Sequence, residues 1–92
     1  MTELVAQARV RIVNQRGLHA RAAARFVKLA TAFQAEVTVA ANGTEVSGAS
    51  IMGLMMLAAS PGCELELNAK GPAAAEAVAA LVKLIEGKFH ED

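Results

Sequence analysis

The residues best suited to chemistry stand in the segment Gly17-Leu18-His19-Ala20-Arg21, where a histidine precedes an arginine by two positions. Apolar residues recur at helical spacing directly after this segment, so we expect an amphipathic helix that begins between Ala20 and Ala22. The start of a helix exposes unpaired backbone N–H groups and the positive end of the helix dipole, which together bind anions. An imidazole there, with a guanidinium nearby, could accept a phosphoryl group and have the new charge stabilised.

The size and composition of the chain restrict the classes of protein it can be. Its 92 residues suffice for a single domain over residues 1–92 with one modest core. The hydrophobic fraction of 54% owes much to 21 alanines, and the chain has no Trp or Tyr, which favours close packing of helices on a sheet. No apolar run is long enough to cross a membrane, and the first residues do not resemble a secretory signal. A single cysteine permits no intrachain disulfide, so we expect a cytoplasmic protein.

The charges are distributed unevenly along the chain although they sum to zero, a balance that argues against general nucleic-acid binding. Up to Lys28 there are six basic residues and one acidic residue, a balance of +5, and the remainder has three basic and eight acidic residues, a balance of −5. The basic part contains His19, as expected for a surface that meets a phosphate or an acidic protein.

The elements that must position His19 follow from the periodicity of apolar residues. Alternation predicts strands over 7–13, 35–41, 44–47 and 63–68, and helical spacing predicts helices from about 20 to 32, over 51–57, and from Gly71-Pro72 to Gly87. The dipeptide Asn42-Gly43 is typical of a hairpin turn. The order β-α-β-β-α-β-α predicts one sheet of about four strands, with the helices on one face and the other face open and polar. The residues expected to face inward from the strands and the last helix are Ala8, Val10, Ile12, Val37, Val39, Cys63, Leu65, Leu67, Val78, Leu81, Val82 and Ile85.

A second motif, Ser50-Ile51-Met52-Gly53-Leu54-Met55, opens the predicted short helix. Ser is a preferred N-cap residue, so capping explains Ser50 as well as regulatory phosphorylation does. Leu54 and Leu57 share the face expected in the core, which leaves Ile51 and the two methionines exposed. Flexible thioether side chains suit a surface that binds several partners. We expect one docking surface around His19, with an apolar centre and a basic rim from the outer face of the first helix. Its predicted members are Ala20, Ala24, Arg25, Lys28, Ile51, Met52 and Met55.

The two motifs together resemble the HPr family, the histidine-containing phosphocarrier proteins of the bacterial phosphotransferase system. The segment from Gly17 to Arg21, followed by Ala23-Ala24 and Phe26-Val27, resembles the active-site segment of that family. The segment from Ser50 to Met55 resembles its signature around a regulatory serine. The resemblance implies an α+β fold, the HPr-like open-faced β-sandwich, in which a four-stranded antiparallel sheet carries three helices on one face.

The resemblance also implies the role of each site residue. His19 matches the histidine that enzyme I phosphorylates on Nδ1, using phosphoenolpyruvate, and that an enzyme II A component then dephosphorylates. Arg21 matches the arginine that neutralises the phosphoryl group, and Ser50 matches the serine modified by HPr kinase/phosphorylase in many bacteria. Ala22 departs from the family, which usually has proline there. Because proline orders a helix start in advance, its loss loosens the site by a fraction of ~1 kcal/mol and removes no phosphate ligand.

We therefore expect a monomeric phosphoryl carrier, which is not an enzyme and needs no cofactor and no metal, and which binds neither nucleic acid nor membrane. Its phosphoryl group must come from a partner, because the chain has no Walker-type loop. Whether it serves sugar uptake or a nitrogen-type regulatory branch stays open. His90, in a polar tail, is assigned no role, and Cys63 is expected to pack in the core.

Two other functions remain open from the residues. One is an HPr-like regulatory module that binds through Ser50 and the Met52/Met55 surface without carrier traffic, a role that would need neither His19 nor Arg21. The other is an enzyme that uses His19 as a general base. That reaction requires a substrate pocket and a second titratable group nearby, and the sequence offers no obvious partner.

Overall fold

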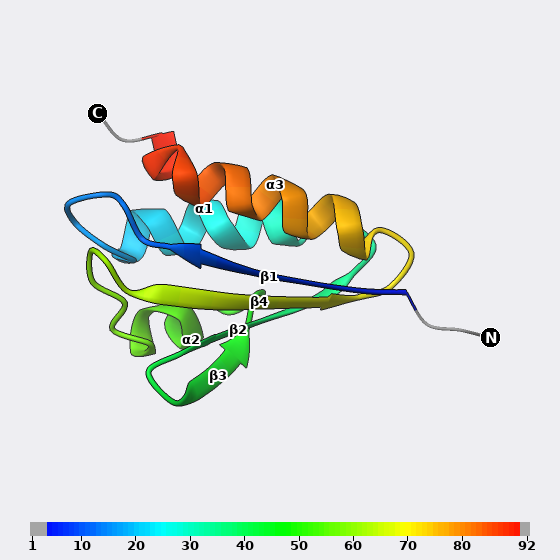
Figure 1. The fold of residues 1–92 in the computed structure, drawn as a ribbon, viewed down its shortest axis with the longest axis horizontal. Helices are drawn as coiled ribbons and strands as arrows, with labels where there is room; N and C mark the ends of the chain where they lie inside the picture. The colour runs from blue at the N-terminus through cyan, green and yellow to red at the C-terminus, as the bar shows by residue number, and fades with distance from the viewer. Residues whose placement is uncertain (1–3, 91–92) are drawn as a thin grey trace.

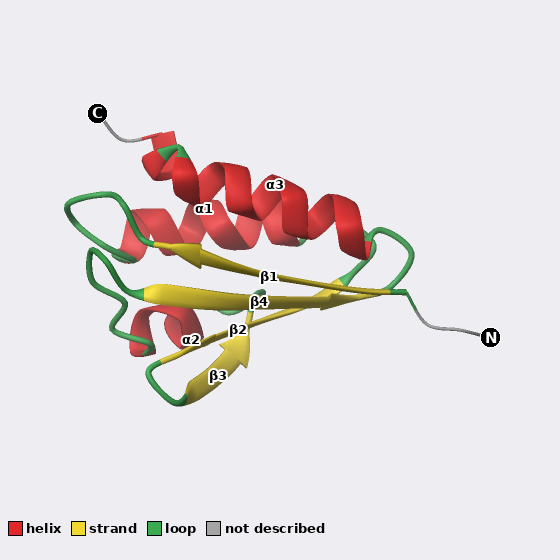
Figure 2. Cartoon of the chain, in the orientation of Figure 1, coloured by secondary structure: helices red, strands yellow, loops and turns green. Residues whose placement is uncertain are grey.

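Residues 4–90 are described by a computed structural model, in which a four-stranded antiparallel sheet carries three α-helices (Figures 1 and 2). The strand order in the sheet is β1-β4-β2-β3. Helices α1 and α2 pack against each other, and α3 packs against α1 and β1. The predicted order of elements and the predicted fold class are both confirmed. The elements are β1 (Val5–Arg11), α1 (Ala20–Ala30), β2 (Glu36–Ala41), β3 (Thr44–Ser47), α2 (Ile51–Met56), β4 (Glu64–Lys70), α3 (Ala74–Glu86) and a 3-10 turn, η1 (Lys88–His90).

The register of the sheet separates an apolar face from a polar one. Val10 lies opposite Leu65, and Val39 lies opposite both Leu67 and Val46, so apolar rows run across the strands beneath the helices. Small residues complete this core, since Ala22, Ala23, Ala30, Ala74 and Ala77 are all buried and let the helix backbones approach the sheet closely. The predicted inward residues of the strands are buried, except Ala8 and Cys63, which are half-buried.

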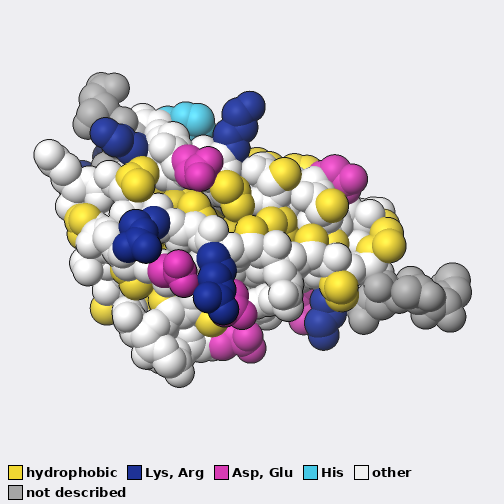
Figure 3. Space-filling model, in the orientation of Figure 1, with side chains coloured by type: hydrophobic (Ala, Val, Ile, Leu, Met, Phe, Trp, Pro, Cys, Tyr) yellow, Lys and Arg dark blue, Asp and Glu magenta, His cyan; other side chains and the backbone are white. Residues whose placement is uncertain are grey.

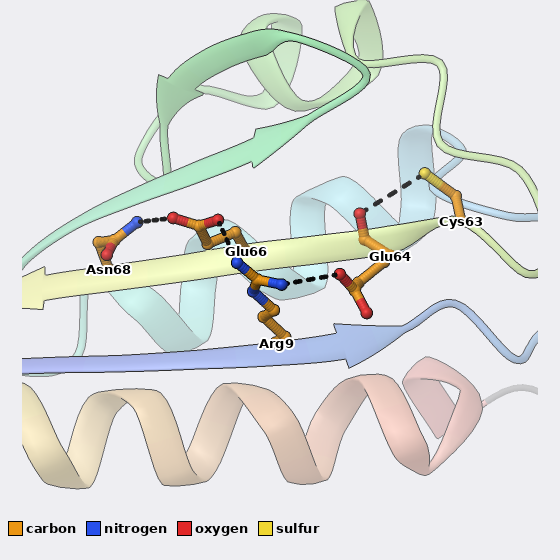
Figure 4. A network of polar contacts seen from close by, with 5 residues as sticks. All are labelled: Arg9, Cys63, Glu64, Glu66 and Asn68. Carbon is orange, nitrogen blue, oxygen red and sulfur yellow. Dashed lines mark hydrogen bonds and ion pairs between the residues drawn. The ribbon is translucent and has the colours of Figure 1, made fainter.

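The opposite face of the sheet is open to solvent and carries charged and polar side chains. Figure 4 shows Arg9 between two carboxylates, with Nη1 3.8 Å from Glu64 Oε1 and Nη2 3.8 Å from Glu66 Oε2. Figure 3 shows charges of both signs side by side on this face. Because these groups are exposed, each ion pair adds less than about 1 kcal/mol to stability, and the helices and the apolar rows must supply most of the stability.

Several predicted boundaries are wrong by a few residues. The first strand covers 5–11 rather than 7–13, although its contact with the fourth strand extends one step further, where the Ile12 N–H donates to the carbonyl of Cys63 at 2.9 Å. The fourth strand runs over 64–70 rather than 63–68, α1 ends at Ala30 rather than near 32, and α2 ends at Met56 rather than 57. The last helix begins at Ala74, so its predicted start at Gly71-Pro72 is also wrong.

The C-terminal end of the described chain differs most from the prediction. Gly87 does end α3, but its φ of −84° is an ordinary right-handed value. The left-handed conformation occurs after it instead, at Lys88, Phe89 and His90, with φ of 60°, 55° and 64°. This turn places Phe89 in the core with 0% of its surface exposed. Leu84 is likewise buried and was not predicted to be. Within residues 4–90, no helix has both the length and the apolar character to span a membrane.

Candidate functional site

His19 is the N-cap residue of α1, at the place where the chain enters the helix. Its backbone is extended, with φ −79° and ψ 179°, and its carbonyl accepts the N–H of Ala23 at 2.8 Å. Helix geometry leaves the N–H groups of Ala20, Arg21 and Ala22 without an acceptor inside the helix. The His19 side chain makes no capping hydrogen bond to them, and the first turn contains no acidic residue. The positive end of the helix dipole is therefore not neutralised by a side chain of α1.

The loop before His19 is fixed by buried contacts. Asn14 is only 2% exposed and donates its Nδ2 to the carbonyl of Gly17 at 2.8 Å. Leu18 is buried, and its N–H donates to the carbonyl of Ala59 at 2.9 Å. Gly17 itself has a φ of +65°, and a Cβ at this position would lie 2.6 Å from the Ala59 oxygen. The half-buried His19 thus follows a buried residue, Leu18, and the path of the chain into α1 requires a glycine at position 17.

The outer face of α1 is basic, as predicted. Arg21, Ala24 and Lys28 are exposed, and Ala20 is exposed at the start of the helix. Arg25 behaves differently, because it is half-buried and its Nη1 donates to the carbonyl of Phe89. Its guanidinium therefore joins α1 to the C-terminal turn, a contact that the sequence reasoning missed. The available signal was a lone aromatic residue, Phe89, in an otherwise polar tail.

The second motif forms the start of α2. Ser50 is its N-cap residue, and Ser50 Oγ accepts the N–H of Gly53 at 2.9 Å. The capping role weighed for Ser50 is therefore confirmed. Leu54 and Leu57 are buried, as predicted, with 0% and 2% of their surface exposed.

The other face of α2 exposes large apolar side chains. Met52 is 74% exposed, and Ile51 and Met55 are 41% and 44% exposed, in agreement with the prediction. Met56, which was not predicted, is 75% exposed. Monomeric domains seldom leave several neighbouring large apolar residues in water unless a partner covers them. Because α2 packs against α1, this apolar surface belongs to the same side of the fold as the helix that begins at His19.

The position of His19 can be compared with three surface hollows of the described residues. Three surface hollows, with volumes of about 500, 320 and 250 Å³, lie elsewhere, and His19 lines none of them. The largest of them lies on the open face of the sheet, between Gln7, Glu36 and Glu66. Within residues 4–90, no group of three or more His, Cys, Asp or Glu residues is placed to hold a metal ion. The start of α1 thus has His19 as its N-cap residue and an exposed Arg21 in its first turn.

Comparisons with known proteins agree on one family. The family model described as "PTS HPr component phosphorylation site" matches residues 6–87. The phosphocarrier protein HPr of Neisseria meningitidis serogroup A is 50% identical over 82 residues, which are 89% of this chain and 92% of that protein. The phosphocarrier protein NPr of Shewanella violacea is 42% identical over 91 residues, covering 99% of this chain and 98% of that protein. A crystal structure of HPr-C-His from Thermoanaerobacter tengcongensis superposes with a TM-score of 0.90, at 42% identity, and the match covers 95% of this chain and 98% of that one.

The role of Gly17 can be tested against a second glycine of positive φ. We expect Gly62→Ala to cost about 1 to 2 kcal/mol, the penalty for a left-handed non-glycine residue, because its φ is +88° and its Cβ would meet nothing within 4 Å. Gly17→Ala should cost about 1 to 3 kcal/mol more, since its Cβ must displace the Ala59 carbonyl. Urea unfolding of both variants measures the difference. Equal losses of stability would contradict the close approach.

Proposed function

The chain belongs to the HPr family of phosphocarrier proteins of the phosphotransferase system, and on that premise we propose that His19 is the residue that carries the phosphoryl group. Its donor is phospho-enzyme I, charged from phosphoenolpyruvate, and its acceptor is an enzyme II A component. The protein acts as a monomeric cytoplasmic carrier and is not itself a catalyst. The observation that carries this proposal is the position of His19 at a helix start that no side chain of α1 caps.

The transfer needs positioning and charge stabilisation more than covalent machinery. The lone pair of His19 Nδ1 attacks the phosphorus atom, so that an N–P bond forms as the bond between phosphorus and the donor breaks. Nε2 keeps its proton throughout. The backbone N–H groups at the start of α1 and the guanidinium of Arg21 stabilise the added negative charge. Attack by the acceptor on the phosphorus atom breaks the N–P bond and returns the unphosphorylated His19.

Phosphorylation of His19 can be tested by mass measurement. After incubation with enzyme I and phosphoenolpyruvate, we expect the mass of one phosphoryl group to be added and then lost in mild acid, because phosphohistidine is acid-labile. His19→Ala should abolish the addition, and His90→Ala, which removes the other histidine of the chain, should leave it unchanged. An acid-stable product would point to a serine and to the regulatory alternative. No product with an active donor would contradict the carrier proposal.

The docking surface proposed for both partners combines the exposed apolar residues of α2 with the exposed outer face of α1. Its apolar members are Ile51, Met52 and Met55, and its α1 members are Ala20, Ala24 and Lys28. This composition, with an apolar centre and a basic rim, favours an apolar partner surface bordered by acidic groups. Arg25 is placed apart from it, because its guanidinium is bonded to the carbonyl of Phe89.

Replacement of a central methionine tests this surface. We expect Met52→Glu to weaken binding to enzyme I by about tenfold or more, because it places a charge in the apolar centre. The melting temperature should hardly change, since Met52 is 74% exposed. Val5→Glu is the control, because Val5 is 65% exposed on β1, away from α2. Calorimetric titration with enzyme I measures the affinity of each variant. Equal affinities of Met52→Glu and Val5→Glu would contradict the proposed docking surface.

Ser50 is proposed as a regulatory phosphorylation site on the edge of the same surface. A phosphate there would suit the start of α2 yet add negative charge beside the partner's acidic groups. We expect Ser50→Asp to leave stability nearly unchanged, because Asp is an equally good N-cap residue, and to slow phosphoryl transfer to His19 by about tenfold. Ser50→Asn, which caps without charge, should transfer at the normal rate. Rapid-quench kinetics measure these rates of phosphoryl transfer. Equal rates for Ser50→Asp and Ser50→Asn would contradict the regulatory role of Ser50.

A further inference from the structure

The C-terminal turn η1 adopts a conformation that its residues disfavour. Lys88, Phe89 and His90 are all non-glycine residues with φ between 55° and 64°. Side chains clash with the backbone in this left-handed region, so three such residues in succession persist only where other contacts hold them.

Two contacts of Phe89 compensate for this strain. Its side chain is completely buried, and η1 packs against both α3 and α1. Its carbonyl accepts a hydrogen bond from Arg25 Nη1 of α1, a residue 64 positions earlier in the chain. The bond is charge-assisted and partly buried, which makes it stronger than a surface hydrogen bond. The turn is therefore attached to α1 by a ring in the core and by a guanidinium at its edge.

Helix α1 needs such a restraint because its start is not capped. A helix of 11 residues is marginal by itself, and this one has neither a capping side chain nor an acidic residue in its first turn. Arg25 lies six residues after His19, in the second turn of the helix. A contact at Arg25 can thus limit the opening of the first turn without occupying the N–H groups there.

From these observations we propose that η1 is a latch on α1 and that Arg25 is the positioning residue through which the latch holds His19 and Arg21 for transfer. The proposal rests on the carrier function proposed for His19. It assigns the half-buried Arg25 to the contact between α1 and η1, and it leaves Arg21 as the arginine that meets the phosphoryl group. Loss of the latch should loosen the start of α1 and lower the rate of transfer within the partner complex, while the affinity for the partner stays the same.

Amide hydrogen exchange of the unphosphorylated protein tests the latch without any phosphoryl donor. The reporter is the N–H of Ala23, which donates to the His19 carbonyl. We expect Arg25→Gln to speed its exchange by about tenfold, as the loss of one charge-assisted hydrogen bond implies. Lys28→Gln removes the same charge from the exposed face of α1 and should leave the exchange rate unchanged. Arg25→Lys keeps a positively charged donor group and should restore most of the protection.

A second variant tests the latch from the side of the turn. Lys88→Gly relieves the left-handed strain at one of the three positions and leaves Arg25 and Phe89 in place, so it should slow the exchange of Ala23 and raise the melting temperature. Lys83→Gly is its control, because glycine inside α3 should lower the melting temperature. Exchange that is equal in Arg25→Gln and in the parent protein would overturn the latch, as would a lower melting temperature in Lys88→Gly.

Transfer kinetics separate a positioning role from a purely structural one. With phospho-enzyme I as donor, at a temperature where each variant is fully folded, we expect Arg25→Gln to lower kcat with KM unchanged and Arg25→Lys to restore kcat. A rise in KM with kcat unchanged would overturn the positioning role and place Arg25 in the docking surface. Absence of labelling in the parent protein would contradict the proposed carrier function instead, and the exchange results would stand independently of it.

Discussion

The rest of the structure depends on one constraint, which is that no side chain of α1 caps the N–H groups at the start of that helix. A missing N-cap interaction commonly costs about 1 kcal/mol. The surrounding elements therefore have to fix the helix by other means. The Asn14 amide, the buried Leu18 and the narrow approach of Gly17 to Ala59 hold the chain before the helix, and Arg25 holds the helix further along.

The contrast between the two short helices makes this constraint visible. At the start of α2, Ser50 Oγ accepts the Gly53 N–H, and the helix begins as most helices do. At the start of α1, the equivalent position is taken by a histidine that leaves the N–H groups to another acceptor. The same fold thus contains one helix start that is capped by its own N-cap side chain and one that is not. This difference fits the phosphoryl group proposed for His19, which would be bound during only part of the transfer cycle.

Local patterns predicted most of this fold. Alternation along β1, β2 and β4, the Asn42-Gly43 turn and the helical spacing after His19 each depend on neighbours in sequence, and the elements they predict are present. The apolar face of α2 was likewise predicted as exposed, since Leu54 and Leu57 already filled the opposite face. The two motifs, at their spacing, were enough to indicate the family.

The features that were missed depend on contacts between distant parts of the chain. Apart from the lone aromatic ring itself, no local pattern indicates that Phe89 enters the core, because three left-handed non-glycine residues in succession are unfavourable unless burial compensates for them. The bond from Arg25 to the Phe89 carbonyl joins residues 64 positions apart. Distant residues also meet before the last helix, which begins only at Ala74. Gly71, at φ +129°, passes close to the Gln34 carbonyl, and a Cβ there would lie 2.8 Å from its oxygen.

The open face of the sheet has a practical consequence. Its side chains, such as Gln7, Thr38 and Asn68, cover no other layer of the fold, so they can be exchanged without disturbing the packing beneath the helices. A fluorophore or spin label attached there would report on tumbling and complex formation from the side of the molecule away from the imidazole. A label on the open face therefore leaves the side chains of α1 and α2 unchanged, including those of the proposed docking surface.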